Sequence, residues 1–292
     1  MKKLITFAIV LIMAVTACGE KEVVSCGAEK DGIVRVAIID TGISTVAIAS
    51  EQLLPGYNYV TNTTDIDDSI GHGTAVASVL LGSKAAGVTG VAPNARVIPL
   101  VVKSRGKDGK IAAIDPAALA LVIRDAVDTY HADVINISIG VAPGTEELRA
   151  AIEYAERKRV LIVASVGNGD INGEVLYPAA YPGVIGVGSV DKDNRVSSFS
   201  QKSAAVMIVA PGEDYWMASR TGKPYGAKGT SYATPFVSGA IALLLEAKPE
   251  LTPVEIREIL YESALDLYNA GHDEASGYGA LQIGKALELA AK

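Results

Sequence analysis

Apolar runs rich in Val and Ile alternate with helical patterns from residue 33 onward, and this alternation restricts the fold more than any other feature. Short runs that are apolar at consecutive positions are typical of strands buried on both faces of a parallel sheet. We expect strands at 33–40, 96–102, 133–139, 160–166, 184–190 and 206–210. We expect helices at 72–81, 115–130, 145–158, 231–248, 253–263 and 281–291. The sequence therefore predicts an α/β fold, a three-layer αβα domain with a doubly wound, mostly parallel sheet.

Four polar residues stand where these strands end or these helices begin. Asp40 and Asn168 follow apolar runs, and His72 and Ser231 precede helical patterns. Ligands of open α/β sheets bind beyond the carboxyl ends of the strands, so the four side chains should meet at one edge. A serine hydroxyl needs a base to become a nucleophile, and an acid can orient that base. An amide can stabilise the oxyanion that forms.

Each of these residues also has a structural interpretation. Ser231 could cap the helix that follows it, and His72 could simply begin a helix. Asp40 and Asn168 could be turn residues beside glycine. The order Asp, His, Ser favours the catalytic interpretation, because it differs from the orders in α/β-hydrolases and chymotrypsin-like enzymes and matches that of subtilisin. No G-x-S-x-G surrounds Ser231.

Six segments in order extend this agreement, and with them the chain resembles the subtilisin-like serine peptidases (subtilases). They are VAIIDTG at 36–42, HGTAVAS at 72–78, GVAP at 90–93, VINISIG at 134–140, GN at 167–168 and GTSYATP at 229–235. The turn at 277–279 also fits. The resemblance implies a serine endopeptidase that forms an acyl-enzyme, with Asp40, His72 and Ser231 as the triad and Asn168 in the oxyanion hole. The alternative is a catalytically silent or restrained binding lipoprotein of the same fold.

The resemblance also implies how a substrate binds. An extended polypeptide would pair with the edge formed by Ser138, Ile139 and Gly140, which is a form of strand addition. Gly167 and the stretch around Leu176 would line the pocket for the side chain before the scissile bond. Many subtilases have glycine where Leu176 stands, so we expect a shallower pocket that prefers small or medium apolar side chains.

We expect no required cofactor and assign no metal ligand. Structural calcium is common among subtilases, but the loop at 82–87 lacks Asn and Asp and contains a lysine. Asp65, Asp67 and Asp68 are interpreted as a solvated loop rather than a metal site.

The N-terminus predicts export and lipid attachment. Lys2 and Lys3 precede an uncharged apolar run that ends at Ala17, which indicates a signal peptide at 1–17. Cys18 then occupies the lipidated position of a bacterial lipobox, although an ordinary secretory signal cleaved before it remains an alternative. Residues 18–32 would be a lipidated tether, 33–292 the peptidase domain, and the protein would be anchored to the cell envelope on the periplasmic or outer side. This tether is too short for the folding propeptide that secreted subtilases usually carry.

Charge and motifs exclude other functions. The formal charge of −7 argues against a nucleic-acid partner. A dinucleotide-binding motif is also absent, because the candidate beginning at Gly167 lacks its third glycine. Cys18 and Cys26 are the only cysteines, so disulfides do not hold the catalytic region together. We expect a monomer that binds polypeptide substrates.

Overall fold

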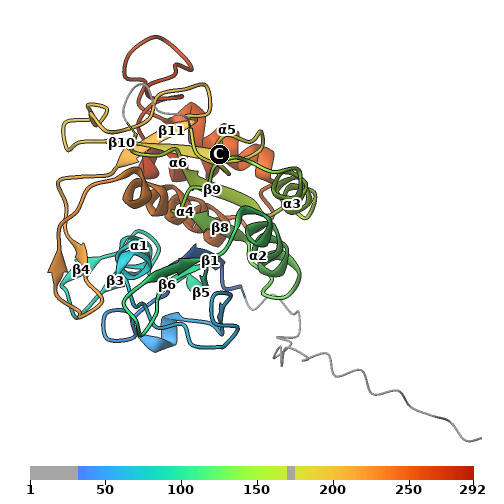
Figure 1. The fold of residues 1–292 in the computed structure, drawn as a ribbon. Helices are drawn as coiled ribbons and strands as arrows, with labels where there is room; N and C mark the ends of the chain where they lie inside the picture. The colour runs from blue at the N-terminus through green and yellow to red at the C-terminus, as the bar shows by residue number, and fades with distance from the viewer. Residues whose placement is uncertain (1–31, 170–174) are drawn as a thin grey trace, which may run out of the picture.

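A seven-stranded sheet forms the centre of the molecule in the computed structural model, which describes residues 32–169 and 175–292 (Figure 1). Its strands, in spatial order, are β11 (Ile208–Pro211), β10 (Ile185–Val190), β9 (Leu161–Ser165), β8 (Val134–Ile137), β1 (Arg35–Asp40), β5 (Arg96–Val101) and β2 (Tyr57–Asn58). Every neighbouring pair in this sheet is parallel. The expected α/β class is therefore confirmed.

The strand order reverses between β1 and β8. β1 pairs with β5 on one side and with β8 on the other, and the chain adds later strands beyond β8. An open sheet of this kind offers a crevice at the carboxyl ends of the strands where the order reverses. Asp40 is the last residue of β1, and Ser138 comes directly after β8, so both lie at this crevice.

Helices cover both faces of the sheet (Figure 1). They are α1 (His72–Leu81), α2 (Pro116–Asp128), α3 (Glu146–Arg157), α4 (Thr230–Ala247), α5 (Pro253–Ser263) and α6 (Ile283–Ala290). α2 and α3 pack together on one face, and α1 and α4 pack together on the other, which gives the three expected layers. In the part of the chain that is described, no helix combines the length and apolarity needed to cross a membrane.

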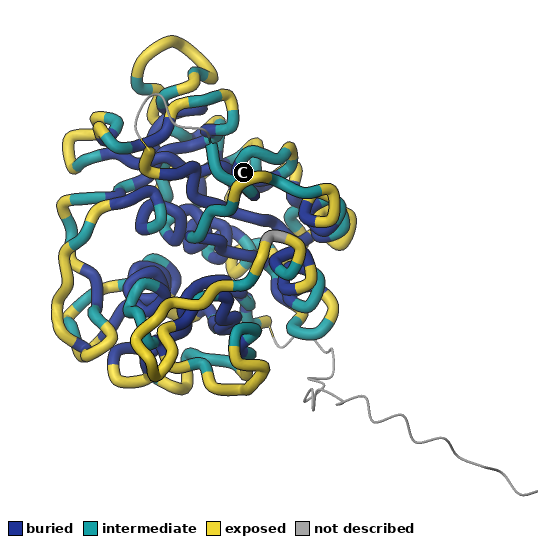
Figure 2. The backbone as a smooth tube through the Cα atoms, in the orientation of Figure 1, coloured by how far each residue is buried: buried dark blue, intermediate teal, exposed yellow. Residues whose placement is uncertain are grey.

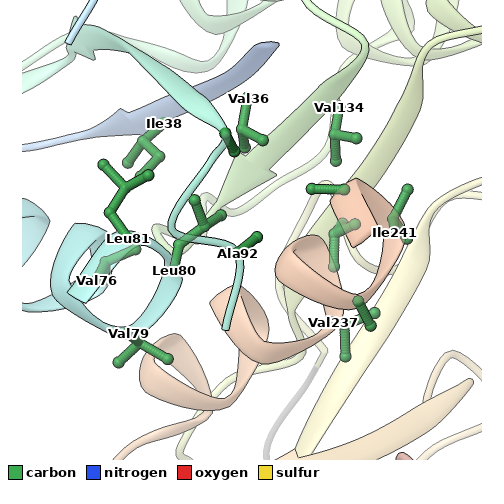
Figure 3. Close-up of a cluster of buried hydrophobic side chains, with 14 of the residues drawn as sticks. Val36, Ile38, Val76, Val79, Leu80, Leu81, Ala92, Val134, Val237 and Ile241 are labelled. Carbon is green, nitrogen blue, oxygen red and sulfur yellow. The ribbon is translucent and has the colours of Figure 1, made fainter. Parts of the chain in front are cut away.

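Alternate residues of β1 enter opposite halves of the core. Val36 and Ile38 belong to the cluster that includes α1 and α4, part of which Figure 3 shows. Ala37 and Ile39 belong to the cluster that includes α2 and α3. Because both faces are covered, the strand is dark along the centre of the molecule in Figure 2 and needs no polar face. This packing fixes the position of Asp40 at its end.

Side-chain caps set the starts of three helices. Asp115 accepts a hydrogen bond from the backbone N–H of Ala118 at the start of α2, and Thr145 caps α3 in the same way. Thr252 and Glu255 form the reciprocal capping box that the sequence predicts for α5. These caps satisfy N–H groups that have no partner within the helix.

Several short strands were not expected. Besides β2, they form three hairpins, which pair β3 (Gly82–Ser83) with β4 (Val88–Thr89), β6 (Lys103–Arg105) with β7 (Ile111–Ala113), and β12 (Met217–Ala218) with β13 (Pro224–Tyr225). Strands of two or three residues are too short to show a hydrophobic period, so the sequence gives no sign of them.

Candidate active site

Asp40 and His72 meet beyond the end of β1. The Nδ1 atom of His72 donates a hydrogen bond to Asp40 Oδ1 at 2.7 Å, and the same oxygen accepts the backbone N–H of Thr41 at 2.7 Å. Only 1% of Asp40 is exposed, whereas His72 is half-buried. A carboxylate on Nδ1 leaves Nε2 of the neutral ring as the nitrogen that can accept a proton.

The surroundings of His72 raise its pKa. Burial acts against this and lowers the pKa of the imidazole, but the charge of Asp40 and its hydrogen bond raise it. The charge of Asp68 raises it further, and Lys103 opposes it, so the pKa lies above the ordinary value for histidine. An imidazolium formed at His72 is therefore stabilised by two carboxylates.

Asp68 organises the loop that carries His72. Its Oδ1 accepts the Thr41 hydroxyl and the backbone N–H groups of Ile70 and Gly71, at 2.7–3.0 Å. Its Oδ2 accepts the backbone N–H and the hydroxyl of Thr74. The expected solvated loop is thus wrong for Asp68, which is fully buried, although Asp65 and Asp67 are exposed. The sequence does not distinguish Asp68 from its exposed neighbours Asp65 and Asp67, because the partners of Asp68 are mostly backbone N–H groups.

Ser231 lies in the first turn of α4 and is joined to Ser138. The hydroxyl of Ser231 donates to the carbonyl oxygen of Ser138 at 3.0 Å, and the hydroxyl of Ser138 donates to the carbonyl oxygen of Ser231 at 2.8 Å. Asn136 donates to Ser138 in turn, at 3.0 Å. These bonds hold the start of α4 against the end of β8.

Pro235 explains why the Ser231 carbonyl is available. The helix predicted over 231–248 begins one residue earlier, at Thr230, and contains Pro235 in its interior. Any other residue at position 235 would donate its backbone N–H to the carbonyl of Ser231, four residues earlier, but proline has no N–H. Ser138 supplies the replacement donor.

Asn168 is held beside the start of α4. Its Oδ1 accepts the backbone N–H of Thr230 at 2.8 Å and the Thr230 hydroxyl at 2.9 Å. A backbone N–H can only donate, so the oxygen of Asn168 must face Thr230 and its amide nitrogen must point elsewhere. A Cβ added to Gly229 would lie 3.3 Å from that nitrogen. The amide N–H groups are thus presented close to the turn that carries Ser231.

Leu176 packs against the two glycines expected in substrate binding. A Cβ added to Gly140 would lie 2.4 Å from Leu176 Cδ1, and one added to Gly167 would lie 3.6 Å from it. Ile139 and Gly140 are half-buried, and antiparallel backbone bonds join Val141 to Tyr177 just beyond them. The structure therefore brings Leu176, Gly140 and Gly167 together.

Two aromatic residues and one arginine near His72 were not anticipated. The rings of His72 and Tyr232 lie with centroids 5.3 Å apart, and Tyr232 is 7% exposed. Tyr225 and Arg220 line the same cavity as these rings. The position of Tyr232 directly after Ser231 was the only available signal, since Arg220 and Tyr225 come from a hairpin that the sequence did not reveal.

The ligand sets that metal ions take in proteins come largely from acidic, histidine and cysteine side chains. Across 32–169 and 175–292, no group of three or more His, Cys, Asp or Glu side chains is placed to hold an ion. Ser83, in the loop considered for calcium, donates its hydroxyl to the carbonyl of Ala47 at 2.6 Å. The predicted signal peptide, Cys18 and Cys26 lie outside the described residues.

Comparison with known proteins relates the sequence of this chain to one family. A model described as the subtilase family matches residues 31–279. Minor extracellular protease Epr of Bacillus subtilis (strain 168) is 33% identical over 252 residues, which are 85% of this chain and 38% of that protein. Subtilisin BL of Lederbergia lenta is 36% identical over 236 residues, which are 80% of this chain and 84% of that protein. This chain spans 58% of the length of another curated relative, the thermophilic serine proteinase of Bacillus sp. (strain AK1).

Solved structures agree with the sequence matches. Fervidolysin from Fervidobacterium pennivorans, a keratinolytic enzyme related to subtilisin, superposes with a TM-score of 0.77 and 30% identity, covering 88% of this chain and 43% of that one. A lanthipeptide protease superposes with a TM-score of 0.76 and 26% identity, covering 88% of this chain and 87% of that one.

Proposed function

The chain belongs to the subtilase family, and from this premise we propose that it is a serine endopeptidase that cleaves proteins or peptides outside the cytoplasm through an acyl-enzyme. The observation that carries the proposal is the 2.7 Å bond between buried Asp40 and His72, beside the helix start that holds Ser231. Asn168, fixed by Thr230, supplies the oxyanion donor. An intact set of this kind favours catalysis over a silent binding role.

The chemistry proceeds in two halves. The Ser231 hydroxyl turns from the Ser138 carbonyl toward Nε2 of His72, gives up its proton and attacks the substrate carbonyl carbon. Asn168 donates to the oxyanion, and His72 then gives the proton to the departing amine as the C–N bond breaks. In the second half, His72 takes a proton from a water molecule, which attacks the ester carbonyl carbon. The bond to Ser231 Oγ then breaks, and His72 returns the proton to Ser231. Asp40 orients the His72 ring through the Nδ1 hydrogen bond and stabilises the imidazolium each time it forms. No step requires a metal or a cofactor.

The substrate would bind as an added strand. In this proposal, the backbone of Ser138, Ile139 and Gly140 pairs with an extended polypeptide, as in other strand-addition complexes. Leu176 occupies space against Gly140 and Gly167, so the side chain before the scissile bond meets a shallow pocket. Small or medium apolar side chains fit such a pocket best. The working unit in this proposal is a monomer, without a nucleic-acid partner.

Labelling with a fluorophosphonate tests the activity directly. Residues 19–292 are incubated with the probe and measured by intact mass, together with a Ser231→Ala variant. We expect one adduct on the parent and none on the variant, because only an activated serine reacts. A folded parent that takes up no probe and cleaves no peptide would refute the proposed function. Circular dichroism of both samples establishes that they are folded.

We further propose that the protein is exported and anchored by lipid on Cys18. Lys2, Lys3 and the apolar run up to Ala17 support a signal peptide, and a relative named as an extracellular protease supports secretion. In cell fractionation, the parent should sediment with membranes, and Cys18→Ser should release it or block its processing. Cys26→Ser is the matched control and should stay with the membranes. Equal partition of the parent and a Cys18→Ser variant that is still cleaved to the mature length would refute anchoring.

A further inference from the structure

A cavity of about 480 Å³ lies beside His72. Three segments line it: the residues before and at the start of α1, the β12–β13 hairpin, and the first turn of α4. Its lining residues are Ile70–His72, Ser219, Arg220, Tyr225 and Tyr232. A cavity of this size accommodates an amino-acid side chain together with part of its backbone.

The cavity lies on the leaving-group side of the scissile bond, given the proposed function. None of the residues on the acyl side, from the edge at 138–140 to Asn168 and Leu176, lines it. His72, which does line it, must deliver a proton to the departing amine nitrogen. The residue that begins with that nitrogen therefore lies next to His72 and can enter the cavity.

Arg220 places a cation at this cavity. Its Nη1 donates to the backbone carbonyl of Asp68 at 2.9 Å, and its Cδ lies 3.8 Å from the position of a Cβ added to Gly71. Arg220 is exposed, and within the described residues no Asp or Glu side chain forms an ion pair with it. A guanidinium carries five N–H donors in a planar fork, so one bond to Asp68 leaves donors for a ligand.

The remaining walls suit a short side chain. Tyr232 is buried against the His72 ring, and Tyr225, which lines the same cavity, is 41% exposed. Aromatic walls contact the methylene groups of a side chain, while the arginine contacts its end.

We propose that this cavity binds the residue directly after the scissile bond and that Arg220 selects an Asp or Glu side chain there. A carboxylate is the group that a guanidinium binds best, through paired and charge-assisted hydrogen bonds. The formal charge of the whole chain is −7, so its overall field repels acidic peptides. A preference for an acidic residue must therefore come from a local cation.

Matched peptides test this subsite. Three fluorogenic substrates differ only after the scissile bond, where they carry Glu, Gln or Ala, and kcat/KM is measured for the parent, Arg220→Gln and Lys223→Gln. We expect the parent to favour Glu over its neutral isostere Gln by about three- to tenfold, the size of one partly exposed charged contact. Arg220→Gln should abolish this preference, so that the Glu and Gln substrates are cleaved with equal kcat/KM. Lys223→Gln, which removes an exposed charge from the same hairpin but not from the cavity, should keep the preference.

The ratio of kcat/KM for the Glu substrate over the Gln substrate distinguishes a role of Arg220 in substrate selection from a purely structural role. If Arg220 only supports the loop through the Asp68 carbonyl, its replacement lowers kcat/KM for Glu and Gln substrates equally, and the proposal is overturned. A parent that cleaves all three peptides without preference overturns the subsite but leaves the proposed peptidase standing. No cleavage and no fluorophosphonate adduct would refute both. An Arg220→Glu variant that favours Lys after the scissile bond would support the subsite.

Discussion

Asp40 accepts the Nδ1–H of His72 at 2.7 Å from a position where only 1% of the aspartate is exposed. Burial lowers the pKa of His72, but the charge and hydrogen bond of Asp40, with the charge of Asp68, raise it above its ordinary value. A general base must be neutral, so kcat/KM rises as pH passes through this pKa. We predict a midpoint above about 6.5, the pKa of an unperturbed histidine. A pH profile of kcat/KM checks it, and a midpoint at or below that value would contradict it.

An Asp40→Asn variant is the control for this profile. It removes the charge that raises the pKa of His72 but leaves the burial that lowers it, so the midpoint should move to lower pH. Activity should fall by about 10⁴-fold, since the amide no longer favours the required tautomer or stabilises the imidazolium. Asp65→Asn, at an exposed position, should leave both quantities unchanged.

Replacement of Asp68 by Asn should destabilise the fold and lower the pKa of His72. The amide nitrogen would face either the backbone N–H of Thr74 or those of Ile70 and Gly71, and buried donors would be left unpaired. We expect a loss of about 2–4 kcal/mol in the free energy of unfolding, measured with urea. The acid limb of the activity profile should also move to lower pH, because one of the raising charges is gone.

Asp67→Asn is the matched control, because Asp67 is the exposed neighbour of Asp68. It should change the free energy of unfolding by less than about 0.5 kcal/mol. Equal stability of the two variants would show that the five bonds accepted by Asp68 are not worth more than a surface charge.

Leu176 should limit the size of the side chain accepted before the scissile bond. The parent should cleave substrates with Ala or Val there better than substrates with Phe, because Leu176 lies against Gly140 and Gly167. Leu176→Gly should raise the ratio of kcat/KM for Phe over Ala by about tenfold or more, since pocket depth is worth at least that in apolar sites. Leu176→Met keeps the side-chain volume and should keep the ratio. A parent that prefers Phe would sink the prediction.

The main strands and helices could be predicted because their apolar pattern is local. β1, β5, α1 and α5 begin and end within two residues of the expected positions, since Val and Ile runs bury both faces of the sheet. The pairing of Asp40 with His72 could also be expected, because one residue ends a strand and the other begins a helix.

The interactions that tune the site could not be predicted, because they join distant parts of the chain through backbone atoms. Asp68 meets Thr41 across 27 residues, and Arg220 meets the Asp68 carbonyl across 152 residues. The hydroxyl of Ser138 donates to the carbonyl oxygen of Ser231, 93 residues away in the sequence. That carbonyl has no helical N–H partner, because the residue four positions after Ser231 is Pro235. A sequence pattern records which side chains are present but not which carbonyl groups they reach.

Gly73 should be intolerant of any side chain, because it brings α1 against the end of β1. A Cβ at this position would lie 2.3 Å from the carbonyl oxygen of Gly42 and 3.2 Å from Asp40 Oδ1. Gly73→Ala must therefore shift α1 or the strand end, at a cost of about 1–3 kcal/mol in the free energy of unfolding. The shift separates Asp40 from His72, so kcat should fall by about 10²-fold, the loss expected from a misplacement of about 1 Å.

Gly284→Ala supplies the control in another helix. A Cβ there meets nothing within 4 Å, and the substitution should stabilise α6 by up to about 1 kcal/mol through helix propensity. Urea unfolding and kcat are measured for both variants. If Gly73→Ala retained full kcat, the contact between α1 and β1 would not be what positions His72 on Asp40, and the short bond between them would have to rest on the Asp68 loop alone.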